Sequence, residues 1–417
     1  MKEHALNKEA VLMKETAIMR EAAFMKELIV FGEDYNRHPS SSQHTVNTLQ
    51  HQFASIQWVN SIGLRKPSPS PRDLARIREK LRNALTAPPR RDDLPPPFPV
   101  IHPLVWPLAE HPLLRWFNQL SVRRQLARKR HLRVVWAALP SAVDYLDALQ
   151  ADVVIYYCGD DFSGLAGVDH LRVKQMEEHM AQRADLILCA SPALVEKMGR
   201  LSPQKTHLLR HGVDFHRFAA PQPDPYPPAP SPTQGRYKIG FYGSLNQWLD
   251  QTLLCELAAA RPEVDFHLIG RRDCDTPLLD ACDNIKFHPP VPHQHLAQYV
   301  QHWDAAILPF VDNAQIRACD PLKLREYLAA GCPVISSNFP AARQYPCLVS
   351  VATSQQDWLD AIDAFCHLSQ QHRLQYRKTA RQHMVNESWE MRGEAVLILI
   401  NNILEEKQTC LPEFSII

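Results

Sequence analysis

The sequence predicts an α/β protein of two Rossmann-like domains that face each other across a cleft, with an extra helix at the N-terminus. Short, continuous apolar segments alternate with helical patterns, which is typical of parallel sheets covered by helices on both faces. The alternation stops once, at residues 219–236, which hold seven prolines, and then restarts. Because 417 residues fit two domains of about 200 residues each, this proline-rich segment is the predicted boundary.

The order of apolar and helical patterns divides the chain into five segments. They are a helical extension (1–27), a first Rossmann-like domain (28–218), the linker (219–236), a second Rossmann-like domain (237–368), and C-terminal helices (369–417) expected to pack back towards the first domain. Strands are expected at 27–32, 55–61, 132–139, 152–158 and 184–191, and after the linker at 237–243, 264–270, 284–288, 304–310, 332–337 and 347–352. Helices are expected at 42–53, 71–85 and 171–183.

Composition narrows the class of protein. The net charge is +1, so affinity for anions must come from local patches. No apolar run approaches the roughly 20 residues that span a bilayer, and the first residues lack the apolar core of a signal peptide. These features predict a cytoplasmic protein. The ten cysteines include no Cys-x-x-Cys pair, which favours buried free thiols over a zinc site or disulfides. No nucleic-acid-binding module is recognisable.

Two stretches carry a family resemblance: "ADLILCASPALVEKM…THLLRHGVDFHRF" and "CDPLKLREYLAAGCPVISS". They resemble family-4-type and related GT-B glycosyltransferases, in which the second stretch lines the nucleotide site. The segments "FGEDYNRHPSSSQH" and "YYCGDDFSGL" are similar to a bacterial subset that assembles exopolysaccharides and teichuronic acids. The resemblance implies an acceptor-binding first domain and a nucleotide-sugar-binding second domain. It implies transfer of a sugar to a glycan or lipid-linked acceptor in surface polysaccharide synthesis, without a metal or cofactor.

One family feature is missing. Many members carry a glutamate seven residues before the one that corresponds to Glu326, whereas residues 313–320 here read "NAQIRACD". Two alternatives therefore stay open. UDP-sugar 2-epimerases share the architecture and use the same donor site, and a non-catalytic member would bind glycans or partners through the cleft.

The strongest local motif starts a helix in the second domain. Asp320 suits the N-cap and Pro321 the first helical position. The free N–H groups of such a start favour a diphosphate. Lys323 and Glu326 share one helical face, so Lys323 would contact phosphate and Glu326 would accept hydrogen bonds from the ribose hydroxyls. The predicted donor contacts here are Asp320, Leu322, Lys323 and Glu326. The alternative is a well-capped helix with solvated charges.

Two strand ends complete the predicted donor site. Gly243-Ser244 ends the first strand of the second domain, and Gly270-Arg271 ends the next. Glycine lets the backbone approach a phosphate or base closely, and Arg271 or Arg272 would add a charge-assisted contact. Ordinary turns also use glycine at such places.

The first domain offers candidates for acceptor chemistry. Asp160 and Asp161 follow an apolar strand, where a carboxylate would remove the proton of an acceptor hydroxyl. Asp161 is the predicted base and Asp160 the second choice, although Asp161 would equally cap the following turn. In the polar loop 33–42, Arg37 and His38 are predicted acceptor contacts, while its serines suit a helix cap.

Residues 113–131 combine apolar residues at helical spacing with a basic cluster. Such a segment can lie on an anionic membrane surface, where each basic residue contributes about 1 kcal/mol. This interpretation makes the protein peripheral on the cytoplasmic face of the membrane. The apolar residues would equally suit a helix that faces the domain core.

Overall fold

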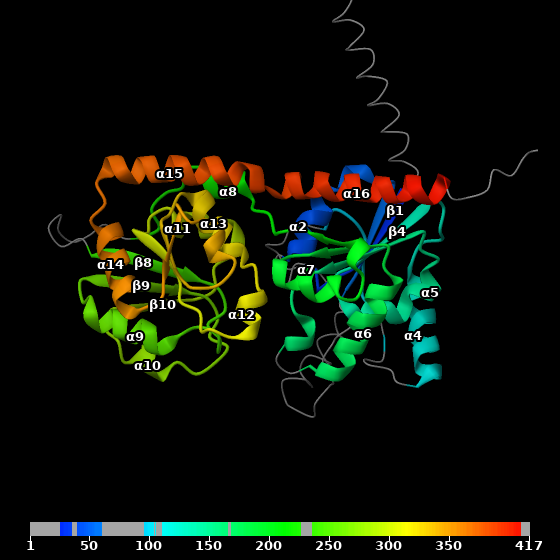
Figure 1. Ribbon diagram of the computed structural model, residues 1–417, viewed down its shortest axis with the longest axis horizontal. Helices are drawn as coiled ribbons and strands as arrows, with labels where there is room; N and C mark the ends of the chain where they lie inside the picture. The colour runs from blue at the N-terminus through cyan, green and yellow to red at the C-terminus, as the bar shows by residue number, and fades with distance from the viewer. Residues whose placement is uncertain are drawn as a thin grey trace, which may run out of the picture. The chain divides into compact units, whose positions relative to one another are not determined.

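The computed structural model describes residues 26–35, 40–60, 96–103, 105, 111–165, 168–226 and 236–409. The chain divides into two units, Met1–Leu209 with Gly393–Ile417, and Arg210–Arg392. Each unit holds its own parallel sheet (Figure 1). The predicted helix at 71–85 and most of the predicted extension lie outside the described residues. The last two residues of that extension, Lys26 and Glu27, begin the first strand instead.

Seven described strands form the sheet of the first unit, in the order β3-β2-β1-β4-β5-β6-β7. Their bounds are β1 (Lys26–Phe31), β2 (Ser55–Val59), β3 (Val100–Ile101), β4 (Leu132–Ala137), β5 (Val153–Cys158), β6 (Leu186–Cys189) and β7 (Thr206–Leu208). Every neighbouring pair is parallel. All residues of β1 and β5 are buried, which explains the continuous apolar sequence of β5 and of β1 from Leu28 onward. The two charged residues that begin β1 have partners: Lys26 donates to Asn401, and Glu27 pairs with Arg133. The strand order reverses between β1 and β4, as in Rossmann folds.

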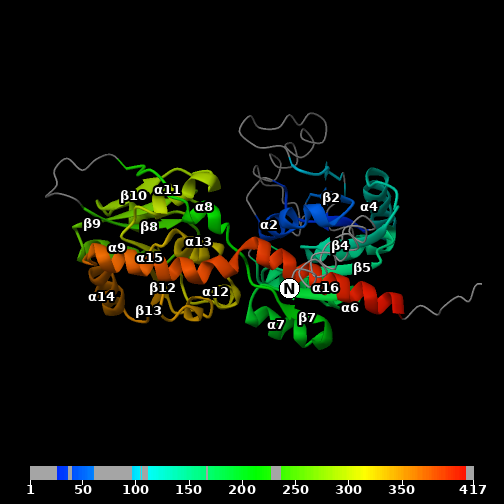
Figure 2. The ribbon, with the colours of Figure 1, turned by 90° about the horizontal axis from the view of Figure 1, so that it is seen from above.

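Helices cover this sheet. Their bounds are α2 (Ser41–Thr48), α4 (Pro112–Gln125), α5 (Leu146–Leu149), α6 (His170–Arg183), α7 (Pro192–Gly199) and α16 (Trp389–Thr409), with short 3-10 turns η1 (Gln50–Gln52), η2 (Pro140–Tyr145), η3 (Phe162–Gly164) and η4 (Pro203–Lys205). The C-terminal helix α16 lies along the strands of this unit (Figure 2). Its Val396, Ile400 and Leu404, spaced one turn apart, are buried in the same hydrophobic cluster as Leu28 and Val30 of β1.

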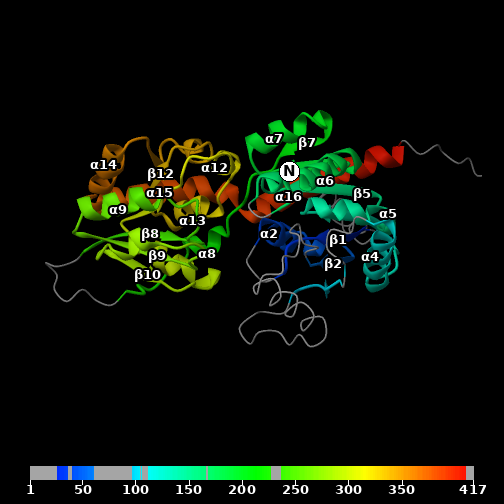
Figure 3. The ribbon, with the colours of Figure 1, turned by 90° about the horizontal axis from the view of Figure 1, so that it is seen from below.

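The second unit repeats the plan with six described strands in the order β10-β9-β8-β11-β12-β13. Their bounds are β8 (Tyr237–Tyr242), β9 (Val264–Ile269), β10 (Ile285–His288), β11 (Ala305–Leu308), β12 (Val334–Ser337) and β13 (Val349–Ala352). Figure 3 shows β8, β9 and β10 side by side. The helical elements are α8 (Phe215–Ala219), α9 (Gln251–Ala260), α10 (Pro277–Asp280), α11 (Leu296–Val300), α12 (Ala314–Ala318), α13 (Leu322–Ala330), α14 (Gln355–Cys366), α15 (Gln370–Met384), η5 (His293–His295), η6 (Ala342–Gln344) and η7 (Val385–Glu387).

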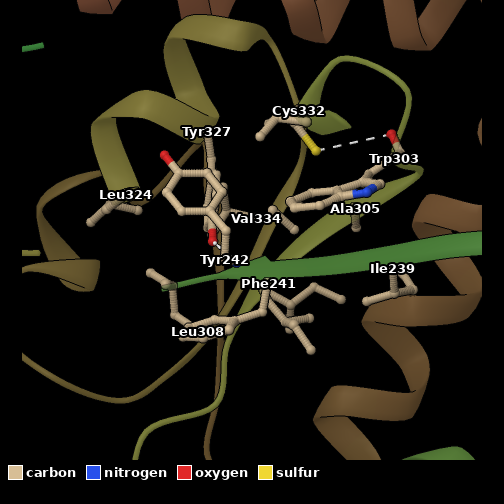
Figure 4. Packing of buried hydrophobic residues seen from close by; sticks show 14 of the residues in the cluster. Ile239, Phe241, Tyr242, Trp303, Ala305, Leu308, Leu324, Tyr327, Cys332 and Val334 are labelled. Carbon is tan, nitrogen blue, oxygen red and sulfur yellow. Dashed lines mark hydrogen bonds between the residues drawn. The ribbon is translucent and has the colours of Figure 1, made fainter. Parts of the chain in front are cut away.

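Aromatic side chains fill the core beside β8. Tyr327 of α13 meets Tyr242 edge-on, with ring centroids 5.0 Å apart, and Trp303 lies 6.0 Å from Tyr327 (Figure 4). A side chain at Gly240 would collide with the Trp303 ring, because an added Cβ would lie 2.0 Å from it. Glycine in this strand therefore makes room for the tryptophan.

These strand orders confirm the predicted fold class of two Rossmann-like α/β domains. The predicted boundary at residue 218 differs from the observed one, since the chain passes from the first unit to the second after Leu209. The reason is local packing: Val213 pairs with Ser388, and Phe218 is fully buried in the second core. Among the described helices, none has the length and apolar character needed to cross a bilayer.

Candidate functional site

The candidate site lies at the carboxyl ends of β8 and β11, where the strand order of the second unit reverses. Rossmann-type sheets bind ligands at this point. Gly243 and Gly270 directly follow β8 and β9 and have φ angles of 137° and 151°, which side-chain-bearing residues rarely adopt. A Cβ on Gly270 would lie 1.9 Å from the carbonyl oxygen of Gly243. Both predicted glycines thus occupy positions that only glycine fits, and they keep this edge of the sheet open.

Helix α13 begins beside these glycines, but the predicted cap is wrong. Pro321 is the N-cap, and its side chain supplies no hydrogen bond. Asp320 turns away: its Oδ1 accepts a hydrogen bond from Nη1 of Arg325 at 2.7 Å, and its Oδ2 one from the backbone N–H of His211 at 3.4 Å. A fully buried guanidinium needs a charged partner, and this requirement outweighs the capping preference.

The Arg325 network ties α13 to the end of the unit. Arg325 Nε also donates to Glu387 at 2.7 Å, and the Tyr345 hydroxyl donates to the same carboxylate at 2.9 Å. Asp320 is therefore part of an ion-pair network below the helix start, and its side chain is almost completely buried.

Lys323 has the most unusual environment at the site. Its Nζ lies 4.6 Å from the ring centroid of Phe241 and 5.6 Å from that of Phe310, and an added Cβ on Gly243 would be 2.6 Å from it. No hydrogen bond or ion pair to another described residue reaches this ammonium. Burial lowers the pKa of Lys323 to about 8, although part of the residue's surface stays accessible. The arrangement suits an anionic ligand that would restore the missing partner.

Glu326, one turn further along α13, is enclosed by two partners that are distant in sequence. Its Oε1 lies 2.6 Å from Nε2 of His293, and its Oε2 accepts a hydrogen bond from the hydroxyl of Tyr242. Burial alone would lower the pKa of His293, but the hydrogen bond and charge of Glu326 outweigh it and raise the pKa. Burial, and then the nearby carboxylate, raise the pKa of Tyr242. The carboxylate is thus held in one orientation.

Sequence reasoning missed Tyr242 and His293. Tyr242 reads as the last apolar residue of a strand, and His293 follows β10 in the loop "PVPHQH". No local pattern connects either residue to Glu326, because the fold alone brings the three elements together.

Ser244 and Arg271 also lie at this edge, and both bind Asp273. The Ser244 hydroxyl donates to the Asp273 carboxylate, and Arg271 Nε donates to it at 2.5 Å. The other candidate, Arg272, pairs with Asp280 at 2.7 Å and stacks on Phe287. The structure therefore gathers Gly243, Ser244, Gly270, Arg271, Lys323 and Glu326 at one end of the sheet, with Asp320 turned beneath it.

In the first unit, Asp161 follows β5 in an ion-pair cluster. Its Oδ1 accepts hydrogen bonds from Lys197 Nζ at 2.6 Å and from the Ser163 hydroxyl at 3.0 Å. Lys197 also donates to the buried carboxylate of Glu177 at 2.7 Å. Burial would raise the pKa of Asp161, but the hydrogen bond and charge of Lys197 outweigh it and lower the pKa. A carboxylate with a lowered pKa is a weaker base.

The structure describes only some of the other predicted acceptor residues. Asp160 accepts a hydrogen bond from the backbone N–H of Asp161 at 2.8 Å. Arg37 and His38 lie outside the described residues. Ser40, in the same loop, forms the capping box of α2 with Gln43, as the capping interpretation predicts.

Helix α4 presents its apolar residues to the outside. Leu113, Trp116 and Phe117 are 69%, 61% and 57% exposed, whereas Asn118 and Val122 form the buried face. The basic residues at 123, 124, 128, 129 and 130 are exposed as well. The interpretation in which the apolar residues face the domain core is therefore wrong for these three side chains.

The described residues bring no three histidine, cysteine or carboxylate side chains together as a candidate metal site.

Comparisons with known proteins find a family model that is similar to part of the second unit. Residues 236–368 match the family model described as glycosyl transferases group 1. A Bacillus subtilis (strain 168) protein, provisionally assigned as the teichuronic acid biosynthesis glycosyltransferase TuaH, is 30% identical over 224 residues, which are 50% of this chain. The match spans only 56% of that relative, or about half its length. The resemblance to GT-B glycosyltransferases is confirmed for this part of the chain.

Solved structures extend the likeness of fold to most of the chain. Anabaena Alr3699/HepE in complex with UDP and glucose has a TM-score of 0.63 at 11% identity, covering 91% of this chain and 100% of that one. Sucrose-phosphate synthase from Thermosynechococcus elongatus has a TM-score of 0.67 at 14% identity, with the same coverage. At such low identity the likeness supports the architecture alone.

Proposed function

We propose that the protein is a glycosyltransferase that moves a sugar from a nucleotide-sugar donor to a glycan or lipid-linked acceptor in surface polysaccharide biosynthesis. The observation that carries the proposal is Lys323. Its ammonium lacks a partner among the described residues, beside Gly243 and the first turn of α13. This point is the strand-order reversal of a segment that matches group 1 glycosyl transferases.

The leaving nucleoside diphosphate would be stabilised there. Its charge grows as the bond to the sugar breaks, and Lys323 with the N–H groups of Leu322 and Lys323 would offset that charge. These groups supply the positive charge that a metal ion provides elsewhere, so we expect activity without an added metal. Because the pKa of the free lysine is about 8, a bound diphosphate would also complete its protonation.

Glu326 would recognise the ribose. A carboxylate oxygen accepts more than one hydrogen bond, so Glu326 would accept from sugar hydroxyls in addition to its bonds with Tyr242 and His293. Those two bonds fix the carboxylate in advance, which lowers the entropic cost of binding. The backbone at Gly243, Ser244 and Gly270 would let the donor approach closely. Arg271 would add a positive charge at the rim of the site.

The proposed acceptor side is the first unit. Asp161 remains the proposed base, with Asp160 as the alternative and Arg37 and His38 as acceptor contacts. The match to TuaH supports an acceptor from a cell-surface polymer, and the solved complex of HepE with UDP and glucose makes a UDP-sugar the first donor to test.

Helix α4 supports a membrane-associated acceptor. Exposed aromatic residues next to exposed arginines form the kind of surface that binds anionic lipid headgroups. We therefore propose that the protein acts in the cytoplasm, on the cytoplasmic face of the membrane.

Donor binding is tested by melting the protein with UDP-, GDP-, ADP- and TDP-sugars. A specific donor should raise the Tm in proportion to the logarithm of its concentration over Kd. Lys323→Met should weaken that effect about 10-fold or more in Kd, since hydrogen bonds to charged groups contribute about 1.5–3 kcal/mol. The matched control is Lys286→Met, at an exposed lysine of β10. If no donor shifts the Tm, or if both variants behave alike, the donor assignment is wrong.

Transfer is tested with a labelled sugar on the donor identified in this way. Label that moves to a lipid-linked glycan supports the proposal. Conversion of the donor to its C2 epimer would support an epimerase, and an unchanged donor would support a non-catalytic binding protein. The comparisons favour neither of these alternatives.

A further inference from the structure

Two cysteines of the second unit lie next to each other outside the candidate site. The Sγ atoms of Cys255 in α9 and Cys282, just after α10, are 3.1 Å apart, and both residues are free thiols. Helices α9 and α10 are neighbours in Figure 1. A disulfide bond has a length of about 2.05 Å, so the two sulfur atoms need to approach by about 1 Å.

Accessibility distinguishes this pair from a second close pair. Cys158 and Cys189 lie opposite each other on β5 and β6, but both are completely buried in the first core. Cys255 and Cys282 are each partly exposed, so a small oxidant can reach them. The sequence-based expectation of buried thiols is therefore correct for Cys158 and Cys189 and wrong for Cys255 and Cys282.

The surroundings also determine how the pair would react. Burial, followed by the neighbouring thiol, raises the pKa of Cys282 to about 11. Only a small fraction of the protein molecules therefore carries Cys282 as a thiolate at neutral pH, which slows its attack on an oxidant. A disulfide is, in turn, reduced slowly by attack on its other sulfur when Cys282 is the leaving group, because a thiol of high pKa is a poor leaving group.

We propose that Cys255 and Cys282 form a redox modification site that a disulfide oxidant such as glutathione disulfide converts into an intramolecular bond. One cysteine attacks a sulfur of the oxidant, forming a mixed disulfide and releasing one glutathione. The other cysteine then attacks Sγ of the first cysteine, which forms the Cys255–Cys282 bond, breaks the bond to glutathione and releases the second glutathione. Two thiols lose two electrons and two protons, and glutathione disulfide takes them up as two molecules of glutathione.

The bond would close a loop that contains β9 and the β9–α10 connection. Chain-entropy estimates for a loop of this length predict a more stable folded state. The site does not depend on the proposed transferase activity, because its formation is measured on the protein alone.

The test incubates the reduced full-length protein in glutathione buffers of increasing oxidant content, blocks the remaining thiols, and maps peptides without reduction. We expect one cross-linked peptide pair, with Cys255 joined to Cys282 and a mass lower by two hydrogen atoms. Cys158 and Cys189 should stay unlinked while the protein is folded. The oxidised protein should melt about 5 °C higher than the reduced one.

Cys255→Ser and Cys282→Ser should each abolish the cross-link and the rise in Tm. If a variant fails to fold, the peptide map of the wild type decides alone. A map in which both cysteines are labelled by the blocking reagent after oxidation, or carry glutathione without the cross-link, would overturn the proposal.

Discussion

Lys323 and Glu326 lie one turn apart on α13 and have opposite environments. The lysine packs against two aromatic rings, without an ionic partner among the described residues, while the glutamate is bonded to Tyr242 and His293. A buried, unpaired ammonium costs free energy, and such groups concentrate where a ligand supplies the missing charge. The difference supports the proposal that Lys323 binds the donor, with Glu326 held in place beforehand.

Glu326→Ala should therefore reduce both donor affinity and stability. From sequence alone, we expect this variant to bind the donor more weakly without unfolding. The contacts add a loss of stability, because the substitution leaves the buried Tyr242 hydroxyl without its carboxylate acceptor, at about 1–3 kcal/mol, and removes the bond to His293. Thermal melting with and without donor measures both effects. Tyr242→Phe is the control, since it removes one hydroxyl but keeps the carboxylate, and it should cost about 1 kcal/mol of stability with a smaller loss of donor affinity than Glu326→Ala. An unchanged Tm in Glu326→Ala would contradict these contacts.

Asp161 can be tested against its partner. If it is the base, Asp161→Asn should lower turnover about 100-fold with donor affinity unchanged. Lys197→Met should retain activity but move the acidic limb of the pH profile upward, because Lys197 is what lowers the pKa of Asp161. A purely structural role predicts a loss of stability in both variants and no movement of the pH limb. Full activity of Asp161→Asn would leave Asp160 as the candidate.

A histidine pair predicts how stability depends on pH. Nδ1 of His267 lies 2.9 Å from Nε2 of His288, and burial, aided by His288, Lys238 and Lys286, lowers the pKa of His267 to about 3. In the unfolded chain the pKa is about 6.5, so the unfolded state binds more protons between these values. Stability is then full above about pH 6.5 and falls as the pH drops towards 3, by at most about 1.4 kcal/mol per pH unit.

Melting curves between pH 7.5 and 5 would measure this dependence. His267→Phe removes the titrating group, so the fall in Tm on acidification should become smaller. The control His295→Phe, at a largely exposed histidine of the same unit, should leave the dependence as it is. Equal slopes in wild type and His267→Phe would show that other groups dominate.

At the scale of elements, α4 is a helix whose polar and apolar residues are both exposed. Only Asn118 and Val122 of the helix are buried. Solvent exposure of Leu113, Trp116 and Phe117 is unfavourable in water, and contact with a lipid surface would remove it. The neighbouring arginines would then contact anionic headgroups.

Replacing Arg123, Arg124 and Arg128 by Gln should reduce sedimentation with anionic liposomes, most at low salt. Lys129 is omitted because it pairs with Asp152 at 2.6 Å. Trp116→Ala should weaken binding at all salt concentrations, since its contribution is apolar. Lys378→Gln, at an exposed lysine of α15, is the charge control. If the wild-type protein does not sediment with these liposomes, the proposed membrane association is wrong.

At the scale of the whole molecule, each unit holds a sheet with its own buried core, and the proposed donor contacts all come from the second unit. Hydrogen exchange should therefore slow on donor addition at residues 242–245, around residue 270, and at the start of α13. Backbone groups of the first unit, such as those of β1 and β5, serve as the internal control. Protection confined to the first unit would place the donor elsewhere.

Much of this fold follows from sequence alone. Continuous apolar segments fix the buried parallel strands, and the glycines at 243 and 270 mark where the backbone has to take angles that other residues avoid. The start of α13 is also predictable to within a residue or two. These features depend on neighbours along the chain, so the sequence contains them directly.

Only the tertiary structure decided which partners each side chain meets. In an isolated helix Asp320 would be the N-cap, but in the folded protein its carboxylate accepts a hydrogen bond from the buried Arg325 instead. Glu326 meets Tyr242 and His293 because β8, α13 and the turn after β10 converge, although they are far apart in the chain. The spacing of apolar residues in α4 fits a core-facing or an outward-facing helix equally well. Much of the packing energy comes from contacts between segments that are distant in the sequence. No local pattern specifies which of these segments will come into contact.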